Sequence, residues 1–253
     1  MTDTIDPLIP AATVVLVRDT ARGLETLMLR RNAKLNFAGG NWVFPGGRID
    51  AADSENAVIN ANRDTDALEQ ACDRPKGEFD AAEQAAVRET REETGLVITD
   101  TQLVYVSHWV APPLMKKRFS TWFFVLPISE EQSQDVQIDG GEIHESRWLT
   151  PQQVLDYATE REMNLLPPTV VTLSELARYQ TTAELLDYYR QREPIVFKPQ
   201  VFIGEKNTAQ EGQFVFLYNG DAGYETTDPS LAGERHRLTS VDGLWEYENT
   251  VYQ

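Results

Sequence analysis

The apolar positions of this chain fall into short runs, and their spacing predicts strands that alternate with helices. A run rich in β-branched residues covers 11–17, between Pro10 and a polar stretch, which is typical of a buried strand. Further runs predict strands at 25–30, 42–44, 103–110, 120–126 and up to Trp148-Leu149. Because helical segments lie between these strands, we expect a mixed α/β (α+β) sandwich.

Helical patterns are marked by their ends. The segment 80–94 is rich in Ala, Glu and Arg and is followed by Gly95, which predicts a helix with an acidic start and a glycine stop. Thr150 before Pro151 predicts the N-cap and first position of another helix. Two more helices are expected over 168–179 and 181–192.

Two stretches differ from the rest of the chain. Residues 48–77 are rich in Asp, Asn, Ala and Glu, so we expect a solvent-facing, partly helical insertion. After Pro194 the pattern is strand-like again, at 196–197, 201–203 and 214–218. We therefore predict a main domain over 8–192 and a β-rich C-terminal extension over 193–253, used for packing or as a dimer contact in a homodimer.

The charge of the chain narrows the class of partner. Its 253 residues carry a formal net charge of −17, which repels nucleic-acid backbones and anionic membranes. A phosphorylated substrate then needs local neutralisation by divalent cations and a few Lys or Arg residues. The single cysteine, Cys72, rules out an intrachain disulfide. With no basic signal-like start and no apolar run of membrane length, we expect a soluble, cytoplasmic protein.

One helix segment carries a cluster of carboxylates. Glu89, Glu92 and Glu93 are spaced so that they share a helix face, where they repel one another unless a cation lies among them. Hard oxygen ligands of this kind suit Mg²⁺ or Mn²⁺. The alternative is an ordinary solvated face of Glu and Arg. The glycine loop Phe44-Pro45-Gly46-Gly47 favours a site, because glycines let a ligand approach the backbone closely.

These two segments resemble a known family. Arg88-Glu89-Thr90-Arg91-Glu92-Glu93-Thr94-Gly95-Leu96 resembles the second half of the Nudix box, and the glycine loop resembles its opening. The resemblance implies a Nudix α/β/α sandwich that hydrolyses a diphosphate linkage with Mg²⁺ or Mn²⁺. It also implies roles: Glu92 and Glu93 as principal metal ligands, Glu89 as a further ligand or base, Gly46 and Gly47 lining the metal and diphosphate site, and Arg88 and Gly95 as structural support.

The chain departs from the family pattern in two places. The family usually places its first glutamate eight positions before the arginine, and here that position is Asp80. Glu78 and Glu83 are nearby, so the choice among the three stays open. The family also keeps the glycine loop close to the helix, whereas residues 48–77 intervene here.

A narrower resemblance concerns the substrate. The segments 29–33, 43–53, 108–113 and 118–124 resemble the Nudix subgroup that contains peroxisomal coenzyme A diphosphatases. This implies a nucleoside diphosphate derivative such as coenzyme A or acyl-coenzyme A. ADP-ribose, NADH or another nucleotide are alternatives. A second alternative is a nucleotide-sensing module that does not hydrolyse its ligand, although such modules often lack the metal glutamates.

Several other residues are candidates for the site. Arg31 and Arg118 are candidate phosphate contacts, since guanidinium groups suit bidentate binding, and Phe44 is a candidate for lining the substrate site. Glu142 lies where many Nudix enzymes have an assisting acid. The alternatives are surface charges for the arginines and a polar turn for Glu142. For Trp109 and Trp122 we expect core packing rather than stacking on a base.

Overall fold

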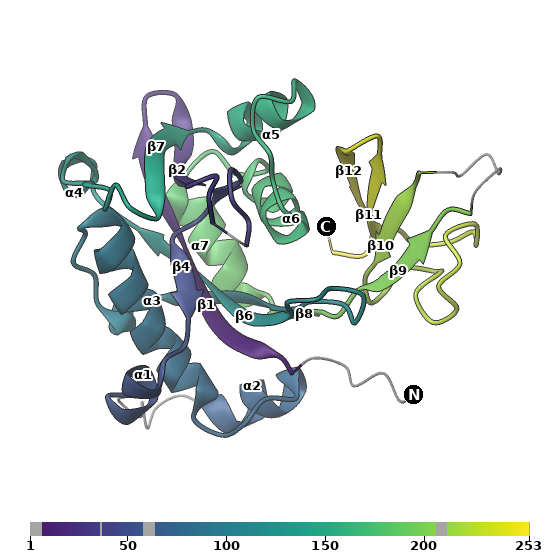
Figure 1. Cartoon of the computed structure of the whole chain (residues 1–253), viewed down its shortest axis with the longest axis horizontal. Helices are drawn as coiled ribbons and strands as arrows, with labels where there is room; N and C mark the ends of the chain where they lie inside the picture. The colour runs from purple at the N-terminus through teal and green to yellow at the C-terminus, as the bar shows by residue number, and fades with distance from the viewer. Residues whose placement is uncertain (1–6, 36, 58–63, 206–211, 253) are drawn as a thin grey trace.

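The computed structural model describes residues 7–35, 37–57, 64–205 and 212–252, and within them it forms two sheets flanked by helices (Figure 1). The larger sheet has eight strands, six of them in the order β3-β2-β1-β6-β5-β8, with β4 joined to β1 and β7 to β2. The smaller sheet has four strands in the order β12-β11-β10-β9. The larger sheet mixes parallel and antiparallel pairs, which confirms the predicted α/β class.

The element bounds follow the apolar runs closely. The strands are β1 (Ile9–Thr20), β2 (Gly23–Arg31), β3 (Trp42–Val43), β4 (Gly46–Arg48), β5 (Val104–Val110), β6 (Phe119–Pro127), β7 (Ile143–Leu149), β8 (Ile195–Phe197), β9 (Gln200–Ile203), β10 (Phe214–Leu217), β11 (His236–Val241) and β12 (Leu244–Asn249). The helices are α1 (Ala51–Glu55), α2 (Thr65–Cys72), α3 (Glu78–Thr94), α4 (Glu130–Gln134), α5 (Pro151–Thr159), α6 (Pro167–Leu176) and α7 (Thr182–Gln191), with a 3₁₀ turn at Asp100–Gln102.

Strand β1 lies in the middle of the large sheet and is covered on both faces. Val15 and Val17 point into one hydrophobic core, whereas Val14 and Leu16 point into another. The first core is closed by α5, α6 and α7, and the second by α3. A strand buried on both faces is apolar at nearly every position, which is why residues 11–17 read as a continuous run.

The predicted helix ends are confirmed. Gly95 closes α3 with φ +73°, a left-handed conformation that glycine adopts without strain. Thr150 caps α5 in a reciprocal capping box with Gln153. Among the helices of the described residues, none combines the length and apolar character needed to cross a bilayer.

The insertion is only in part solvent-facing, which corrects the expectation for 48–77. It contains α1 and α2, and Asp53, Glu69 and Cys72 are buried. The Glu69 carboxylate accepts hydrogen bonds from the backbone N–H groups of Gly77 (3.0 Å) and Phe79 (2.8 Å). It therefore satisfies donors at the start of α3 that a helix leaves unpaired.

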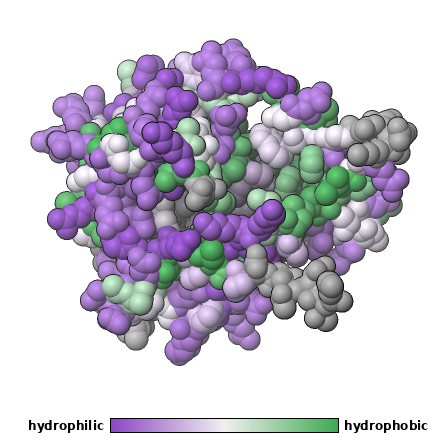
Figure 2. Space-filling model, in the orientation of Figure 1, coloured by the Kyte–Doolittle hydropathy of each residue, from purple (hydrophilic) through white to green (hydrophobic). Residues whose placement is uncertain are grey.

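The C-terminal part adds a sheet that was only half predicted. Strand β8 lies just past the predicted boundary at residue 192 and pairs in parallel with β5, so it belongs to the large sheet. The four-stranded sheet leaves Ile203 and Phe214 partly exposed, and apolar side chains gather over this region in Figure 2. Strands β11 and β12 were not predicted.

Candidate active site

Close packing of α3 against β4 positions the candidate site. Strand β4 pairs with β1, with Gly46 opposite Thr13. A Cβ atom on Gly46 would lie 2.4 Å from the carbonyl oxygen of Ala12, and one on Gly47 would lie 2.3 Å from the Glu89 carboxyl group. The glycine loop thus allows both the sheet backbone and a carboxylate of α3 to approach within van der Waals distance.

Glu93 is the most buried carboxylate of the cluster. Its side chain is 7% exposed, accepts the Gly46 N–H at 2.9 Å and lies 3.6 Å from the Arg31 guanidinium. Burial raises the pKa of Glu93 from 4.5 to about 8, and the neighbouring Glu89 adds to this, whereas Gly46 and Arg31 oppose it. The raised pKa means that burial disfavours the charged form of Glu93, which a cation beside it would favour.

The other two glutamates of the cluster have different surroundings. Glu89 is 16% exposed and receives Arg88 Nη1 at 2.8 Å, and burial raises its pKa despite that contact. Glu92 is 59% exposed and lies 3.2 Å from the same Arg88 nitrogen. The structure therefore holds Glu89 and Glu93 at the glycine loop and leaves Glu92 on the solvent side.

Arg88 joins the acidic cluster to the insertion. Its guanidinium donates two bonds to Asp53, at 3.0 and 2.8 Å, and a third to the Arg48 carbonyl at 2.9 Å. Asp53 lies in α1, near the start of the insertion, and α1 packs on α3. The carboxylate that holds Arg88 is thus Asp53, which the sequence analysis missed.

The three acids considered for the first acidic position of the motif lie in the first two turns of α3. Glu78 forms a two-bond ion pair with Arg74 and accepts the Trp122 indole N–H at 3.0 Å. Asp80 and Glu83 are buried in the first turns of α3. With a rise of about 1.5 Å per residue, Asp80 lies roughly 12 Å along the helix from Arg88. The sequence does carry a signal for Asp53, because the acidic start of α1 directly follows the glycine loop.

The variant Asp53→Asn tests this contact. Loss of the charged, two-bond contact should lower the free energy of unfolding by about 1–3 kcal/mol and kcat by about 10- to 100-fold, because Arg88 orients Glu89. Urea denaturation and steady-state kinetics measure the two effects. Asp50→Asn is the matched control, because Asp50 is 65% exposed and its carboxylate comes no closer than 3.9 Å to the Arg88 guanidinium. Equal behaviour of the two variants would contradict the role given to Asp53.

Two further predicted residues reach the cluster. Arg31, at the end of β2, lies between Glu93 and Glu142, with Nη2 3.1 Å from Glu142 Oε2. Glu142 is 61% exposed at the turn that precedes β7. The site therefore has an arginine and a glutamate opposite α3, as well as the glutamates of the helix.

Other predicted residues lie outside the cluster. Arg118 donates to the Ala111 carbonyl at 3.1 Å in the connection between β5 and β6. Phe44 is 3% exposed within the hydrophobic core, so it packs the fold and offers no surface to a substrate, which corrects its predicted role. Trp109 and Trp122 are core residues, as expected.

The donor set suits a divalent cation, although its side chains are paired with arginines here. Among the described residues, no three Asp, Glu, His or Cys side chains are gathered closely enough to hold a metal ion. Glu89 and Glu92 form ion pairs with Arg88, and Glu93 forms one with Arg31. Glu93, which is buried, and Glu89, which is half-buried, both have raised pKa values and nevertheless form a hard-oxygen environment that a cation would stabilise. Glu89, Glu92 and Glu93 would hold it.

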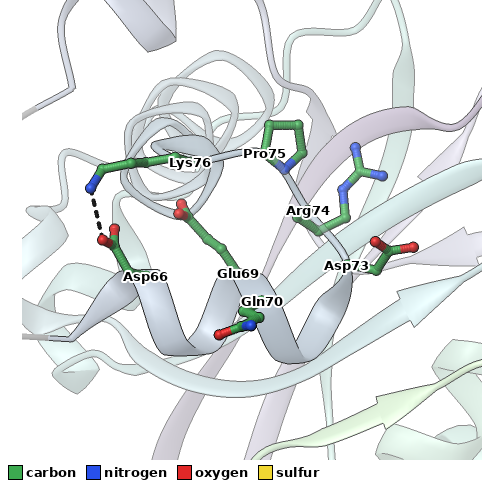
Figure 3. A pocket seen from close by; sticks show the side chains of 7 residues that line it. All are labelled: Asp66, Glu69, Gln70, Asp73, Arg74, Pro75 and Lys76. Carbon is green, nitrogen blue, oxygen red and sulfur yellow. Dashed lines mark hydrogen bonds and ion pairs between the residues drawn. The ribbon is translucent and has the colours of Figure 1, made fainter.

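A second hollow of the surface lies apart from this cluster. It is formed between α2 and the start of α3 and is lined by Asp66, Glu69, Gln70, Asp73, Arg74, Pro75 and Lys76 (Figure 3). Its charged groups are largely paired, Lys76 with Asp66 at 2.7 Å and Arg74 with Glu78 at 2.7 Å. We assign it no part in the chemistry.

The comparison with protein families agrees with the geometry. Residues 7–167 match the NUDIX domain. The chain belongs to the Nudix family. A curated Caenorhabditis elegans protein, "Putative nudix hydrolase 7", is 24% identical over 211 residues, which cover 77% of this chain and 69% of that protein.

One solved structure shows the same fold. The crystal structure of a NUDIX hydrolase from Alicyclobacillus acidocaldarius matches with a TM-score of 0.59 and 22% identity, over 73% of this chain and 97% of that one. The NUDIX domain of Shewanella oneidensis NrtR, crystallised with ADP ribose, matches less well, with a TM-score of 0.44 and 19% identity, over 68% and 88% of the two chains.

Family membership establishes the general activity. The chain is a Nudix hydrolase, and enzymes of this family generally use divalent metal ions. The acidic helix and the glycine loop both fall within the matched residues. The resemblance to the coenzyme A diphosphatase subgroup stays a prediction.

Proposed function

We propose that this Nudix hydrolase cleaves the diphosphate linkage of a nucleoside diphosphate derivative, with coenzyme A or acyl-coenzyme A as the first candidate substrate. The observation that supports the chemistry is the pair of carboxylates, half-buried Glu89 and buried Glu93, held against the glycine loop. Coenzyme A is proposed on the sequence resemblance alone. ADP-ribose and NADH remain the alternative substrates.

The residues of the chain have distinct tasks in this proposal. The cluster of Glu89, Glu92 and Glu93 binds Mg²⁺ or Mn²⁺, which neutralises phosphate charge and acidifies a bound water when present. Gly46 and Gly47 have no side chains, so β4 and the Glu89 carboxylate lie close together, and in this proposal the diphosphate binds beside them. In this proposal Arg31 contacts substrate oxygens and Glu142 assists proton removal from water, which their position opposite the helix supports.

The reaction itself is a simple displacement. The oxygen of water bonds to one phosphorus atom, and the bridging P–O bond breaks. The bridging oxygen leaves on the other phosphate, and the water proton passes to a carboxylate or to solvent. Both products therefore carry a terminal phosphate.

An activity screen tests the proposal. The purified protein is incubated with coenzyme A, acyl-coenzyme A, ADP-ribose, NADH and dinucleoside polyphosphates, each with Mg²⁺, with Mn²⁺ and with EDTA. We expect metal-dependent release of a nucleoside phosphate product from at least one compound, a 3′,5′-bisphosphate in the case of coenzyme A, detected by chromatography. Tight binding of a nucleotide with no turnover under any metal condition would instead favour the sensing module, and turnover in EDTA would exclude the metal-dependent mechanism.

A further inference from the structure

A row of mutually opposed residues crosses the large sheet from the glycine loop to the C-terminal part. Arg48 on β4 is opposite Ala11 on β1, Ala11 is opposite Thr121 on β6, and Thr121 is opposite Trp109 on β5. Phe197 on β8 completes the row. Directly opposed residues project from the same face of a sheet. With strands about 4.8 Å apart, the row spans about 19 Å.

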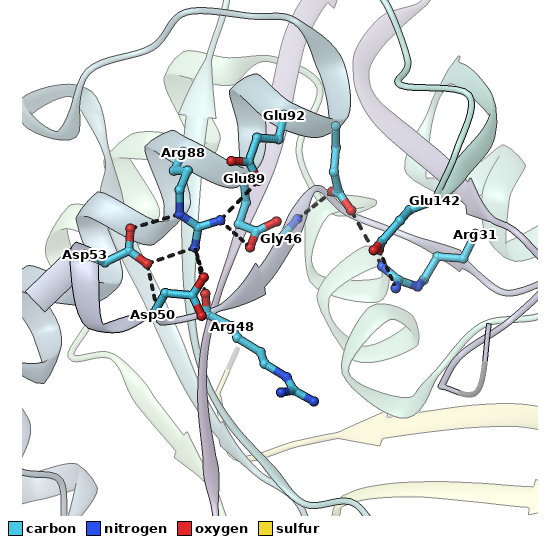
Figure 4. A network of polar contacts seen from close by, with 10 residues as sticks. Arg31, Gly46, Arg48, Asp50, Asp53, Arg88, Glu89, Glu92 and Glu142 are labelled. Atoms are coloured by element: carbon cyan, nitrogen blue, oxygen red, sulfur yellow. Dashed lines mark hydrogen bonds and ion pairs between the residues drawn. The ribbon is translucent and has the colours of Figure 1, made fainter.

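Arg48 projects away from the acidic helix. The side-chain position of Gly47 points at the Glu89 carboxyl group, and successive residues of a strand point to opposite faces. The Arg48 side chain accordingly extends away from Arg88 and Glu89 (Figure 4). Strand β4 pairs with β1 and with no other strand among the described residues. A ligand at the glycine loop can thus pass around the free edge of β4 to the face that carries Arg48.

Arg48 is an available cation with a fixed backbone. Its carbonyl accepts a bond from Arg88 at 2.9 Å, and the ladder to Ala11 fixes its position on the sheet. Its guanidinium is exposed, and within the described part of the chain it has no hydrogen bond or ion pair. Arg31, by contrast, contacts both Glu93 and Glu142. Arg48 can bind an anion without breaking an existing ion pair.

The surface between Arg48 and Trp109 has small side chains. Ala11, which is buried, and Thr121, which is partly exposed, lie in the row itself. At the far end, Trp109 stacks on Phe197 with ring centroids 3.8 Å apart, and Tyr218 of the C-terminal extension packs edge-on against both rings. The strip is therefore bounded by a cation at one end and by packed aromatic rings at the other.

We infer that this strip carries the part of the substrate that is not cleaved, and that Arg48 binds a phosphate oxyanion of the substrate there. The inference rests on the proposed function. In this strongly acidic chain, an arginine that has no partner among the described residues and lies beside the diphosphate site supplies local charge complementarity for a phosphate. The phosphate belongs either to the diphosphate itself or to a further phosphate on the nucleoside.

Paired substrates and matched variants test this inference. Arg48→Ala, Arg48→Lys and the control Arg91→Ala are compared on coenzyme A and 3′-dephospho-coenzyme A, and on NADPH and NADH. Arg91 is an exposed arginine on the solvent side of α3, so its loss changes the net charge equally. KM and kcat are measured with metal, and Kd of each compound is measured by calorimetry in EDTA, so that binding is tested even without turnover.

We expect Arg48→Ala to raise KM or Kd by roughly 10- to 100-fold, with an intermediate effect for Arg48→Lys and little effect for Arg91→Ala. An effect on both members of a pair assigns the contact to the diphosphate. An effect only on the member with the extra phosphate assigns it to that phosphate. Either pattern supports the inference.

The bulkier variant Thr121→Phe tests the strip itself, and it should raise KM or Kd for every bound compound. Unchanged constants in Arg48→Ala and Thr121→Phe would overturn the inference while leaving hydrolysis by the wild type, and with it the proposed function, intact. Failure of the wild-type protein both to hydrolyse and to bind all four compounds would overturn the inference as well. Binding without hydrolysis would count against the proposed function alone.

Discussion

Replacement of Glu93 by glutamine is expected to lower kcat by about 10²- to 10⁴-fold while the protein stays folded. Glu93 accepts the Gly46 N–H of the glycine loop at 2.9 Å. Glutamine keeps the size of the side chain and an oxygen acceptor for that N–H, but it removes the negative charge that would bind a cation. Steady-state kinetics with saturating Mg²⁺ or Mn²⁺ measure the loss.

The same variant should change how stability depends on pH in metal-free buffer. The pKa of Glu93 is about 8 in the folded protein, compared with 4.5 for an ordinary glutamate. The folded state therefore binds this proton more tightly than the unfolded state does, and the free energy of unfolding falls as pH rises from about 4.5 to about 8. Glutamine does not titrate, so Glu93→Gln lacks this contribution.

Urea denaturation between pH 5 and pH 9 in EDTA, at about one-unit steps, separates the two proteins. We expect the variant to be at least as stable as the wild type at the alkaline end, because it no longer buries a charge. Glu92→Gln is the control, since that side chain is mostly exposed and should show no such difference in stability. A Glu93→Gln protein with wild-type turnover would remove Glu93 from the chemistry.

The parts of the fold that local sequence determines were predictable. Helix α3 ends at Gly95 and α5 begins after Thr150 because glycine in a left-handed conformation and a threonine cap act within a few residues. Strand β1 was visible because both of its faces are buried. The glycine loop and the glutamates on α3 were likewise recognisable from fixed spacing.

The contact partners of those residues were harder to predict from the sequence. Asp53 and Arg88 are 35 positions apart, and their contact depends on the packing of α1 against α3 after the insertion. Counting back from Arg88 along a continuous helix leads to Asp80, which lies too far along α3. Phe44 was misassigned for a similar reason: an aromatic beside a glycine loop has the same sequence pattern whether it faces a ligand or the core.

The hairpin of β11 and β12 was missed although its turn has a clear signal. Asp242 and Gly243 connect Val241 to Leu244 and have φ values of +53° and +80°. An Asp-Gly pair with both residues in the left-handed region is the preferred two-residue hairpin turn. The strands themselves alternate apolar and charged residues, such as Glu246 and Glu248 on β12, so no apolar run marks them.

Replacement of Gly47 by alanine is expected to abolish most of the activity without unfolding the protein. The new Cβ would lie 2.3 Å from the Glu89 carboxyl group, which is the mobile end of a side chain and must move away. Glu89 would then lose its position beside Glu93 and its 2.8 Å contact with Arg88. We expect kcat to fall by about 10²-fold or more, comparable to the loss of one aligned catalytic group.

Stability should respond differently at the two glycines of the loop. Gly47 has no left-handed backbone, so alanine fits its conformation and the free energy of unfolding should change by no more than about 1 kcal/mol. Gly46 has φ +158°, and its Cβ would meet the Ala12 carbonyl at 2.4 Å and Thr13 Cα at 2.8 Å, which are backbone atoms that cannot rotate away. Gly46→Ala should therefore unfold at clearly lower urea concentration than Gly47→Ala.

A double-mutant cycle identifies the cause of the activity loss in Gly47→Ala. If displacement of Glu89 is the mechanism, Glu89→Ala lowers kcat on its own but has little further effect in the Gly47→Ala protein, so the two changes are strongly non-additive. Additive losses would show that the alanine methyl group acts on the substrate rather than through Glu89. In that case Gly47 would be needed so that the substrate can approach β4. The position of the Glu89 carboxylate would then not depend on this glycine.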